Sequence, residues 1–352
     1  MDEGDNLTDY DGFQDYNFTS IPECDESSLQ NFDSVVRPVL YGLIFLVGVL
    51  ANGLMTTVLL RRRRRLRITE IYLLHLALAD FLLLLTLPLE IQASAAGWAS
   101  GEFLCMLAGL LRQLNLFGGS LLLALIGFDR YLAIVHAVPS MQSRRPRRVH
   151  LACISLWLLA LLLSFPNAVF LSVAKEDDSS IPACYHCRFG IHSSNWLQAN
   201  RALNLLCFFF SLAVMSYCYT ALVVTLCHSQ KNQAKKGAIR LALLVTLVFC
   251  FCWLPYNVTS LIQAALDLGG IPYESCDFLV PLNQAVTLTH SLGVSHCCLN
   301  PFLYAFVGVQ FRNELIQLVC RLGGRVCACF PRGRIHSRPS TSEGTSTNTT
   351  NF

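Results

Sequence analysis

The sequence predicts an all-α membrane protein, a seven-transmembrane helix bundle with a short amphipathic eighth helix. Of the 352 residues, 53% are hydrophobic and only 14% are charged, whereas ordinary soluble chains have about 25% charged residues. The apolar residues are also gathered into seven runs, and each run is long enough to cross a hydrocarbon core roughly 30 Å thick. Both observations indicate that the chain is surrounded by a lipid bilayer.

The chain begins with an acidic arm, which we expect to be disordered and extracellular over residues 1–36. Ten of these residues are acids and none is lysine or arginine, and a segment of this composition buries too little apolar surface to fold. Glycosylation sequons begin at Asn6 and Asn17, which indicates exposure outside the cytoplasm. Tyr10 and Tyr16 lie among the acids and are candidates for sulfation and for contact with a ligand.

Seven apolar runs form the predicted bundle, which occupies residues 37–308. The predicted spans are 38–60, 70–94, 103–135, 149–173, 197–227, 238–266 and 278–308. Proline removes a backbone hydrogen bond from a helix interior, so prolines inside these spans predict kinked helices that pivot. These prolines are Pro88, Pro166, Pro255 and Pro301.

The charges in the loops predict the orientation of the bundle. Clusters of arginine and lysine follow the first, third and fifth spans, at 61–67, 144–148 and 231–240. The loops on the other side carry mainly acids, for example at 176–178. Because cytoplasmic loops are enriched in basic residues, we expect the N-terminus to be extracellular and the C-terminus cytoplasmic in a multi-pass protein of the plasma membrane.

Two different segments follow the last span. Residues 309–323 place apolar side chains at helical spacing with charges between them, which predicts an amphipathic helix at the inner surface of the membrane. Residues 324–352 are rich in serine and threonine, and we expect a disordered cytoplasmic tail that receptor kinases phosphorylate. Phosphorylation would place several phosphates close together on this tail, and we expect such a tail to recruit arrestin.

The sixteen cysteines fall into two groups. Most lie inside apolar runs, where they behave as small hydrophobic residues, and the others lie on the predicted oxidising face. The second group is Cys24, Cys105, Cys276, and Cys184 or Cys187. Sequence alone does not settle which cysteines are joined. We favour the pairs Cys105–Cys184 and Cys24–Cys276, with Cys187 unassigned.

Several polar side chains lie within the apolar runs, where contact with lipid would be costly. They are Asn52, Asp80, Asn115, His296 and Asn300. We expect them to converge on an interior polar network with Asp80 as its charged member, which a sodium ion or water can complete. The alternative is that they hold helices together without acting as a switch, and the residues alone leave both hypotheses open.

Six short motifs occur in order along the spans. They are Asn52, Leu76-Ala-Leu-Ala-Asp80, Asp129-Arg130-Tyr131, Trp157, Cys252-Trp253-Leu254-Pro255 and Asn300-Pro301-Phe-Leu-Tyr304. Together they resemble the rhodopsin-like G-protein-coupled receptors. The resemblance implies a heterotrimeric G protein as the cytoplasmic partner. It also implies an activation switch made of Asp129, Arg130, Tyr131, Trp253, Pro255, Asn300, Pro301 and Tyr304.

Other features narrow the resemblance. They are Thr86-Leu-Pro88, Trp98 ahead of Cys105, the runs 129–137 and 296–301, and the second pair of outer cysteines. These features resemble chemokine receptors, and the segments 31–33, 57–61, 215–219 and 303–309 resemble the CXC subgroup. The resemblance implies a CXC chemokine ligand, an inhibitory-type G protein and a role in leukocyte chemotaxis. The ligand-binding residues that we predict are Tyr10, Tyr16, Glu90, Trp98, Arg112, Tyr256 and His290.

Three positions depart from the pattern of chemokine receptors. Ser211 stands where the fifth helix usually has proline, Glu90 replaces a tryptophan, and His290 replaces an acid common on the seventh helix. We predict that Glu90 and Arg112 form an ion pair in the ligand pocket. Both fall in the outer third of the membrane on neighbouring helices, where an unpaired charge is costly. The alternative is that each side chain reaches water separately.

Other functional classes are disfavoured by the sequence. It has no metal-ligand spacing, phosphate loop or nucleophile motif, so neither an enzyme nor a resident cofactor is indicated, and nucleic acid is not an expected partner. No internal repeat indicates a transporter. Two hypotheses remain: a chemokine receptor coupled to a G protein, favoured by Asp129-Arg130-Tyr131, and an atypical scavenging receptor that signals through arrestin only, favoured by Ser211.

Overall fold

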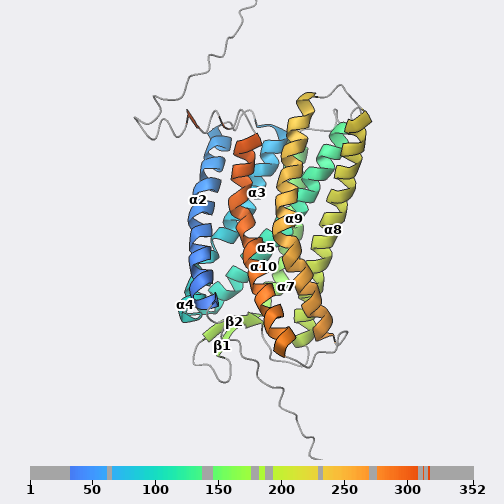
Figure 1. Cartoon of the computed structure of the whole chain (residues 1–352). Helices are drawn as coiled ribbons and strands as arrows, with labels where there is room; N and C mark the ends of the chain where they lie inside the picture. Colours follow the sequence, from blue (N-terminus) through green and yellow to red (C-terminus); the bar gives the residue numbers. More distant parts are fainter. Residues whose placement is uncertain are drawn as a thin grey trace, which may run out of the picture.

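A computed structural model shows long helices that run side by side, with a small β-hairpin at one end (Figure 1). It describes residues 32–61, 66–136, 146–175, 182–186, 193–228, 233–268, 276–307, 312 and 316–317. The helices of the bundle are α2 (Arg37–Arg61), α3 (Ile68–Leu84), α4 (Leu87–Ala96), α5 (Gly101–Ile134), α7 (Pro146–Val169), α8 (Ser193–His228), α9 (Gln233–Asp267) and α10 (Cys276–Val307).

The predicted bundle of seven transmembrane helices is confirmed. Six helical stretches in the described part of the chain are long and apolar enough to cross a membrane, with α3 and α4 together forming one of them. The seventh helix, α10, has 32 residues, or about 48 Å at 1.5 Å per residue, and packs along α9 and α2. Its length therefore also exceeds the thickness of the hydrocarbon core.

The outer surface of the bundle is apolar. Leu158 on α7, Phe210 on α8 and Phe251 on α9 are between 63% and 72% exposed. A soluble protein rarely exposes so many large apolar side chains on one surface, whereas lipid tails solvate them without cost. The polar groups of the backbone are satisfied inside each helix, as a membrane requires. The surface thus agrees with the lipid bilayer that the composition predicts.

Two predicted boundaries need correction. The fourth span was predicted to run to residue 173, but α7 ends at Val169 and Leu171–Lys175 form strand β1. This strand pairs antiparallel with β2 (Pro182–His186), and Val173 lies opposite Cys184. The pairing satisfies backbone groups that would be unpaired beyond the helix end. At the N-terminus, helical structure begins in η1 (Phe32–Val36), inside the stretch 1–36 that was predicted to be a disordered arm.

The second span is interrupted between α3 and α4. The hydroxyl of Thr86 donates to the carbonyl of Leu83 at 2.8 Å, and Pro88 occupies the first turn of α4. In the first turn of a helix a backbone N–H has no hydrogen-bond partner within the helix, so proline, which lacks this N–H, is tolerated there. Gly97 ends α4 with a φ of 78°, a conformation that glycine adopts readily. The interruption redirects the end of this span, which carries Glu90.

Helix α5 lies at the centre of the bundle and packs against α3, α7, α8, α9 and β1. It is the most buried of the six spans. A Cβ atom on Gly109 would lie 2.0 Å from a methyl carbon of Leu171, so a larger residue here would require the Leu171 side chain to move. The largest apolar core cluster lies farther along the bundle and includes Phe249 and Leu123.

Candidate functional site

The hairpin is tied to the start of α5 by the disulfide Cys105–Cys184, which confirms the predicted pair. Trp98 reinforces this attachment: its backbone N–H donates to the carbonyl of Pro182 at 2.6 Å and its indole N–H donates to the carbonyl of Gly101 at 2.9 Å. Cys276 is also disulfide-bonded. Its predicted partner, Cys24, lies outside the described residues, so that pair stays a prediction.

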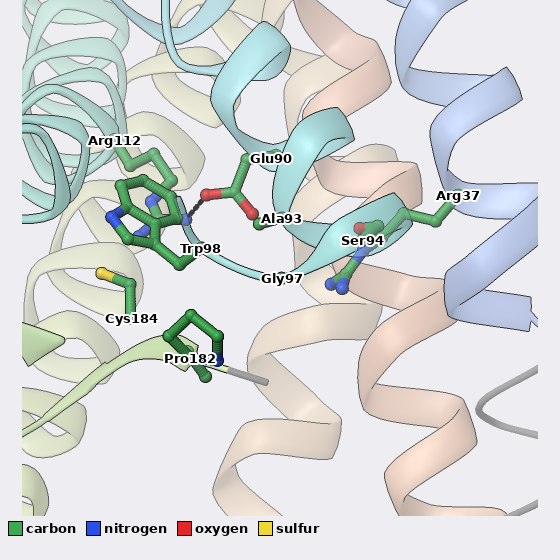
Figure 2. A pocket seen from close by; sticks show the side chains of 10 residues that line it. Arg37, Glu90, Ala93, Ser94, Gly97, Trp98, Arg112, Pro182 and Cys184 are labelled. Carbon is green, nitrogen blue, oxygen red and sulfur yellow. Dashed lines mark hydrogen bonds and ion pairs between the residues drawn. The ribbon is translucent and has the colours of Figure 1, made fainter. Parts of the chain in front are cut away.

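A cavity of about 330 Å³ lies under the hairpin, and we call it the hairpin cavity. Side chains from α2, α4, α5 and β2 converge on it, as Figure 2 shows. Its lining consists of Arg37, Glu90, Ala93, Ser94, Gly97, Trp98, Arg112, Pro182, Ala183 and Cys184. Three of the predicted ligand-binding residues, Glu90, Trp98 and Arg112, therefore share one cavity.

An ion pair crosses the hairpin cavity. Nη1 of Arg112 on α5 donates to Oε1 of Glu90 on α4 (dashed in Figure 2). The arginine side chain is 31% exposed and the glutamate side chain 17%, so the pair is shielded from bulk water without being fully enclosed. The predicted pairing of these residues is confirmed, and the alternative, in which each reaches water separately, is wrong.

An aromatic cluster made of Tyr41, Trp253, Tyr256 and His290 lies deeper in the bundle. Nδ1 of His290 is 3.3 Å from the hydroxyl of Tyr41, and the ring centroid of His290 is 5.2 Å from that of Tyr256 and 6.2 Å from that of Trp253. The predicted ligand residues Tyr256 and His290 belong to this cluster and do not line the hairpin cavity.

The aromatic cluster connects to a buried polar network through Trp253. The indole N–H of Trp253 donates to Nδ1 of His296 at 3.1 Å, and Nε2 of the same imidazole is 3.5 Å from Oδ1 of Asp80. Oδ2 of Asp80 accepts a hydrogen bond from the side-chain amide of Asn300 at 2.9 Å. Helices α3, α9 and α10 are thereby joined by consecutive polar contacts around one buried carboxylate.

Asn52 and Asn115 contribute to the interior in a different way from the predicted one. The side-chain amide of Asn52 donates to the carbonyl of Cys297 at 2.9 Å, and that of Asn115 to the carbonyl of Ala79 at 2.9 Å. Each asparagine thus holds a neighbouring helix by its backbone beside the network. For these two residues the geometry fits the hypothesis of contacts that hold helices together.

The surroundings of Asp80 fit a small cation. Its Oδ1 is buried and, within the described part of the chain, accepts no hydrogen bond. Carboxylate and amide oxygens are the ligands that hard cations prefer. A buried oxygen without a partner is costly, so a cation that reached Asp80 would remove that cost.

The predicted switch lies at the opposite end of α5. Nη2 of Arg130 donates to Oδ2 of Asp129, and both residues are buried. Nearby, the hydroxyl of Tyr219 on α8 lies 3.2 Å from that of Thr246 on α9, so a hydrogen bond joins the two helices. Tyr131 lies beside them, with its hydroxyl 3.1 Å from Nε2 of His136. Asp129 and Arg130, two residues of the predicted switch, therefore form an ion pair in this structure.

Two prolines of the predicted switch lie inside continuous helices. Pro255 lies within α9 and Pro301 within α10. Beside Pro255, the side-chain amide of Asn257 donates to the carbonyl of Trp253 at 2.9 Å. The backbone of Tyr304 is helical, and its side chain is outside the described part. The hydrogen bond from Asn257 supports α9 at the place where Pro255 removes a backbone hydrogen bond.

Comparison with known proteins identifies the family. A family model for the 7 transmembrane receptor (rhodopsin family) matches residues 51–304. The C-X-C chemokine receptor type 3 of Bos taurus is 40% identical over 336 residues, which cover 95% of this chain and 88% of that protein. The chain belongs to the chemokine receptors of the rhodopsin family. The type 3 receptor of Homo sapiens is 40% identical over 322 residues, covering 91% of this chain and 84% of that protein.

A second type of chemokine receptor is also similar. The C-X-C chemokine receptor type 5 of Mus musculus is 36% identical over 342 residues, which cover 96% of this chain and 91% of that protein. The segments 31–33, 57–61, 215–219 and 303–309 predicted a likeness to type 3 first and type 5 second. This chain is similar to receptors of both types, and its identity to the type 3 receptor is the higher of the two.

Sequence reasoning missed some residues around the site of this chemokine receptor. Arg37 lines the hairpin cavity, and its only signal was its place at the start of the first span. Two amide pairs join helices nearby: Gln113 donates to Asn204, and Asn200 donates to Asn167 at 2.7 Å. All four amides lie in the outer halves of predicted spans. That position was a signal, but it does not tell which amides meet.

Several predicted residues cannot be placed. Tyr10, Tyr16, Asn6 and Asn17 lie outside the described residues, as does the serine and threonine tail. In the segment 309–323, the structure describes only three residues. Sulfation, glycosylation and the amphipathic eighth helix therefore stay predictions for this chemokine receptor.

Proposed function

We propose that the protein is a plasma-membrane receptor for a CXC chemokine and that it activates an inhibitory-type heterotrimeric G protein. The observation that carries the proposal is the intact pair Asp129–Arg130 near one end of α5, because the other half of the same helix contributes Arg112 to the hairpin cavity. The similarity to C-X-C chemokine receptors over most of the chain supports the ligand class. Leukocyte chemotaxis is the proposed response.

The N-terminus is proposed to be extracellular, in agreement with the basic residues of the opposite loops. Its ten acids would attract a basic ligand through a long-range field, and such a field raises association rates more than final affinity. The ligand would then reach the hairpin cavity. Capture by the arm and engagement of the bundle are separate steps, so separate variants test them.

Activation requires two conformations with different affinities for the ligand. In the resting one, Asp129 neutralises Arg130 and the bond between Tyr219 and Thr246 holds α8 to α9. A pivot of α9 near Pro255 would separate these helices and release Arg130 toward the G protein. Trp253 lies two residues before Pro255 and contacts both the aromatic cluster and the polar network, so it is placed to link the ligand to this pivot.

Asp80 is the residue that would hold a sodium ion. A bound cation would add positive charge beside the carboxylate, and His296 and Asn300 position that carboxylate from α10. At the cytoplasmic side we propose that receptor kinases phosphorylate the tail and that arrestin reads the added charge.

Cells that express the receptor, challenged with a panel of CXC chemokines, provide the test. G-protein activation and arrestin recruitment are measured in parallel, with ligand uptake as a third readout. We expect at least one chemokine to activate the inhibitory G protein. The alternative is a scavenging receptor, which the sequence favours through Ser211. This residue is buried, and its hydroxyl has no partner in the described part of the chain. Uptake with arrestin recruitment and no G-protein response would favour the scavenging receptor.

A further inference from the structure

Gly293 on α10 lies directly against the indole ring of Trp253 on α9. A Cβ atom on this glycine would lie 2.8 Å from Cε3, 2.9 Å from Cζ3 and 3.1 Å from Cδ2 of the indole. Carbon atoms in favourable contact are about 3.5–4.0 Å apart. All three indole atoms belong to the same rigid ring system, so rotation of a flexible tip cannot relieve the overlap. A side chain at position 293 would therefore displace the indole as a whole.

The same stretch of α10 holds the indole by two other contacts. The indole N–H donates to Nδ1 of His296 at 3.1 Å, and His296 follows Gly293 by three residues. The ring of His290, three residues before Gly293, meets the indole edge-on, with centroids 6.2 Å apart. Residues three apart are neighbours on one side of a helix. We call this surface of α10, made of His290, Gly293 and His296, the indole contact face.

The indole has little room to move while it stays on this face. Trp253 is only 4% exposed, and the rings of Phe249 and Tyr256 lie with their centroids 6.4 Å and 5.8 Å from it. Apart from proline, glycine is the least favourable residue in a helix interior, so Gly293 weakens α10 locally. What the glycine permits in return is the close approach of the indole to the backbone of α10.

This contact joins the two helices that the proposed pivot moves apart. Trp253 lies two residues before Pro255, where α9 lacks a backbone hydrogen bond, whereas the indole contact face belongs to α10. Figure 1 shows α9 and α10 side by side along the bundle. A pivot of α9 relative to α10 would therefore carry the indole along the contact face or away from it. Because glycine has no side chain, the ring can leave Gly293 without passing over one.

We propose that Gly293 is the positioning residue of Trp253 and that the indole contacts it only in the resting conformation, in which Asp129 neutralises Arg130. When α9 pivots, the ring leaves Gly293 and its bond to His296 is lost. A methyl group at position 293 therefore disfavours the resting conformation more than the active one. A change that disfavours one of two conformations shifts their populations toward the other. This inference rests on the proposed function, because it names a contact that regulates basal activity.

Gly293→Ala tests the proposal without a ligand. An extra methyl group in a well-packed interior predicts a shift of roughly 5- to 150-fold in the equilibrium between the two conformations. We expect basal G-protein activation, measured per receptor at the cell surface, to rise at least about fivefold. Gly53→Ala on α2 is the matched control and should keep the parent level, because a Cβ atom there meets no packed neighbour within 4 Å in the described part of the chain. Basal activation that Gly293→Ala leaves unchanged or lowers overturns the proposal.

Melting temperatures in detergent distinguish a displaced ring from a general defect. In the parent background, Gly293→Ala should lower the melting temperature, because the methyl group overlaps the indole. In the Trp253→Ala background the indole is absent, so the same change should raise the melting temperature, since alanine favours a helix over glycine and the methyl group fills part of the space that the ring leaves. Equal decreases in both backgrounds would show that Gly293 acts independently of Trp253, which overturns the proposal.

Fluorine NMR reports the position of the ring itself. The chain has four tryptophans, so the receptor labelled with fluorotryptophan gives few resonances, and Trp253→Phe identifies the one that belongs to Trp253. Gly293→Ala should shift this resonance and Gly53→Ala should leave it in place. A resonance that Gly293→Ala does not move shows that the methyl group does not displace the indole, and overturns the proposal.

These tests separate the inference from the proposed function. If no chemokine activates the receptor, the proposed function fails, while the melting temperatures and the fluorine resonance still decide whether Gly293 positions Trp253. If a chemokine activates the receptor and Gly293→Ala leaves basal activation unchanged, the proposed function stands and the assignment of this contact to the resting conformation is wrong. Surface expression of each variant is measured alongside, so that a folding defect is not mistaken for a change in activity.

Discussion

Removal of either partner of the Glu90–Arg112 pair should destabilise the receptor. Breaking a fully buried pair costs about 3–5 kcal/mol, and an exposed pair contributes about 0–1 kcal/mol. The side chains of this pair are 31% and 17% exposed and border a cavity, so the cost falls between these limits. We expect Glu90→Gln and Arg112→Gln each to lower the free energy of unfolding by about 1–2 kcal/mol.

A change of this size is measurable as a shift in melting temperature. For a chain of more than about 150 residues, 1 kcal/mol shifts the melting temperature by about 2–4 °C, so each single variant should melt about 2–8 °C lower in detergent. The double variant Glu90→Gln with Arg112→Gln should lose less than the sum of the single losses. The charge-swapped variant, Glu90→Arg with Arg112→Glu, should recover part of the stability. Glu102→Gln, a change to an exposed carboxylate at the same end of the bundle, is the control.

Comparison of the single variants with the double variant can refute the assigned ion pair. If the single losses are strictly additive in the double variant, the two charges act independently and the coupling that we assign to the ion pair does not exist. A normal melting temperature for both single variants would equally show that the cavity solvates each charge without the other. The Glu102→Gln variant should melt with the parent protein, which excludes a general effect of removing negative charge.

Four further predictions test the other parts of the proposal. Arg130→Ala should abolish G-protein activation while chemokine binding and surface expression persist, and preserved signalling would contradict its role as a switch. Deletion of residues 2–20 should lower both the association rate and its salt dependence, whereas unchanged rates would indicate a merely solubilising arm. Truncation after Arg338 should slow arrestin recruitment and internalisation; equal internalisation would mean that the tail is not read. Asp80→Asn should remove any effect of sodium concentration on chemokine affinity, and a sodium effect that persists would place the cation elsewhere.

The helices were predictable because their signals are local. Each span needs only a sufficient run of apolar residues, and the predicted boundaries of α2 and α10 lie within two residues of the observed ones. The pairing of Glu90 with Arg112 was predictable for a related reason. A fixed rise per residue converts sequence distance from Asp80 and Arg130 into depth, and depth placed both charges in the same layer of the membrane.

The parts that sequence did not predict depend on how elements far apart in the chain meet. The strand at Leu171–Lys175 continues the apolar run of α7 without a break in composition. It becomes a strand because β2, attached to α5 by Cys184, offers it a partner. Asn52 and Asn115 were correctly expected to face the interior, but their partners are backbone carbonyls. Every helix presents carbonyls, so residue types do not reveal which one is used.

The position of the two arginines on α5 constrains how a ligand can act. Arg112 and Arg130 are eighteen residues apart, which is five turns at 3.6 residues per turn and about 27 Å along the axis. They therefore lie on the same face of one helix, Arg130 near its end and Arg112 about a third of the way along it. Because α5 is enclosed by neighbours along this length, its own movement would disturb both ends at once.

The simpler route to activation keeps α5 in place and moves its neighbours. Glu90 belongs to α4, while Trp253 and Pro255 belong to α9, and contacts from Trp253 through His296 to Asp80 connect α9 with α10 and α3. A ligand that engages Arg112 shifts the equilibrium only if the hairpin cavity differs between the two conformations. Breaking the Glu90–Arg112 pair should therefore change basal G-protein activation as well as stability. An unchanged basal level in both single variants would show that the pair is equivalent in the two conformations and that the ligand acts through other contacts.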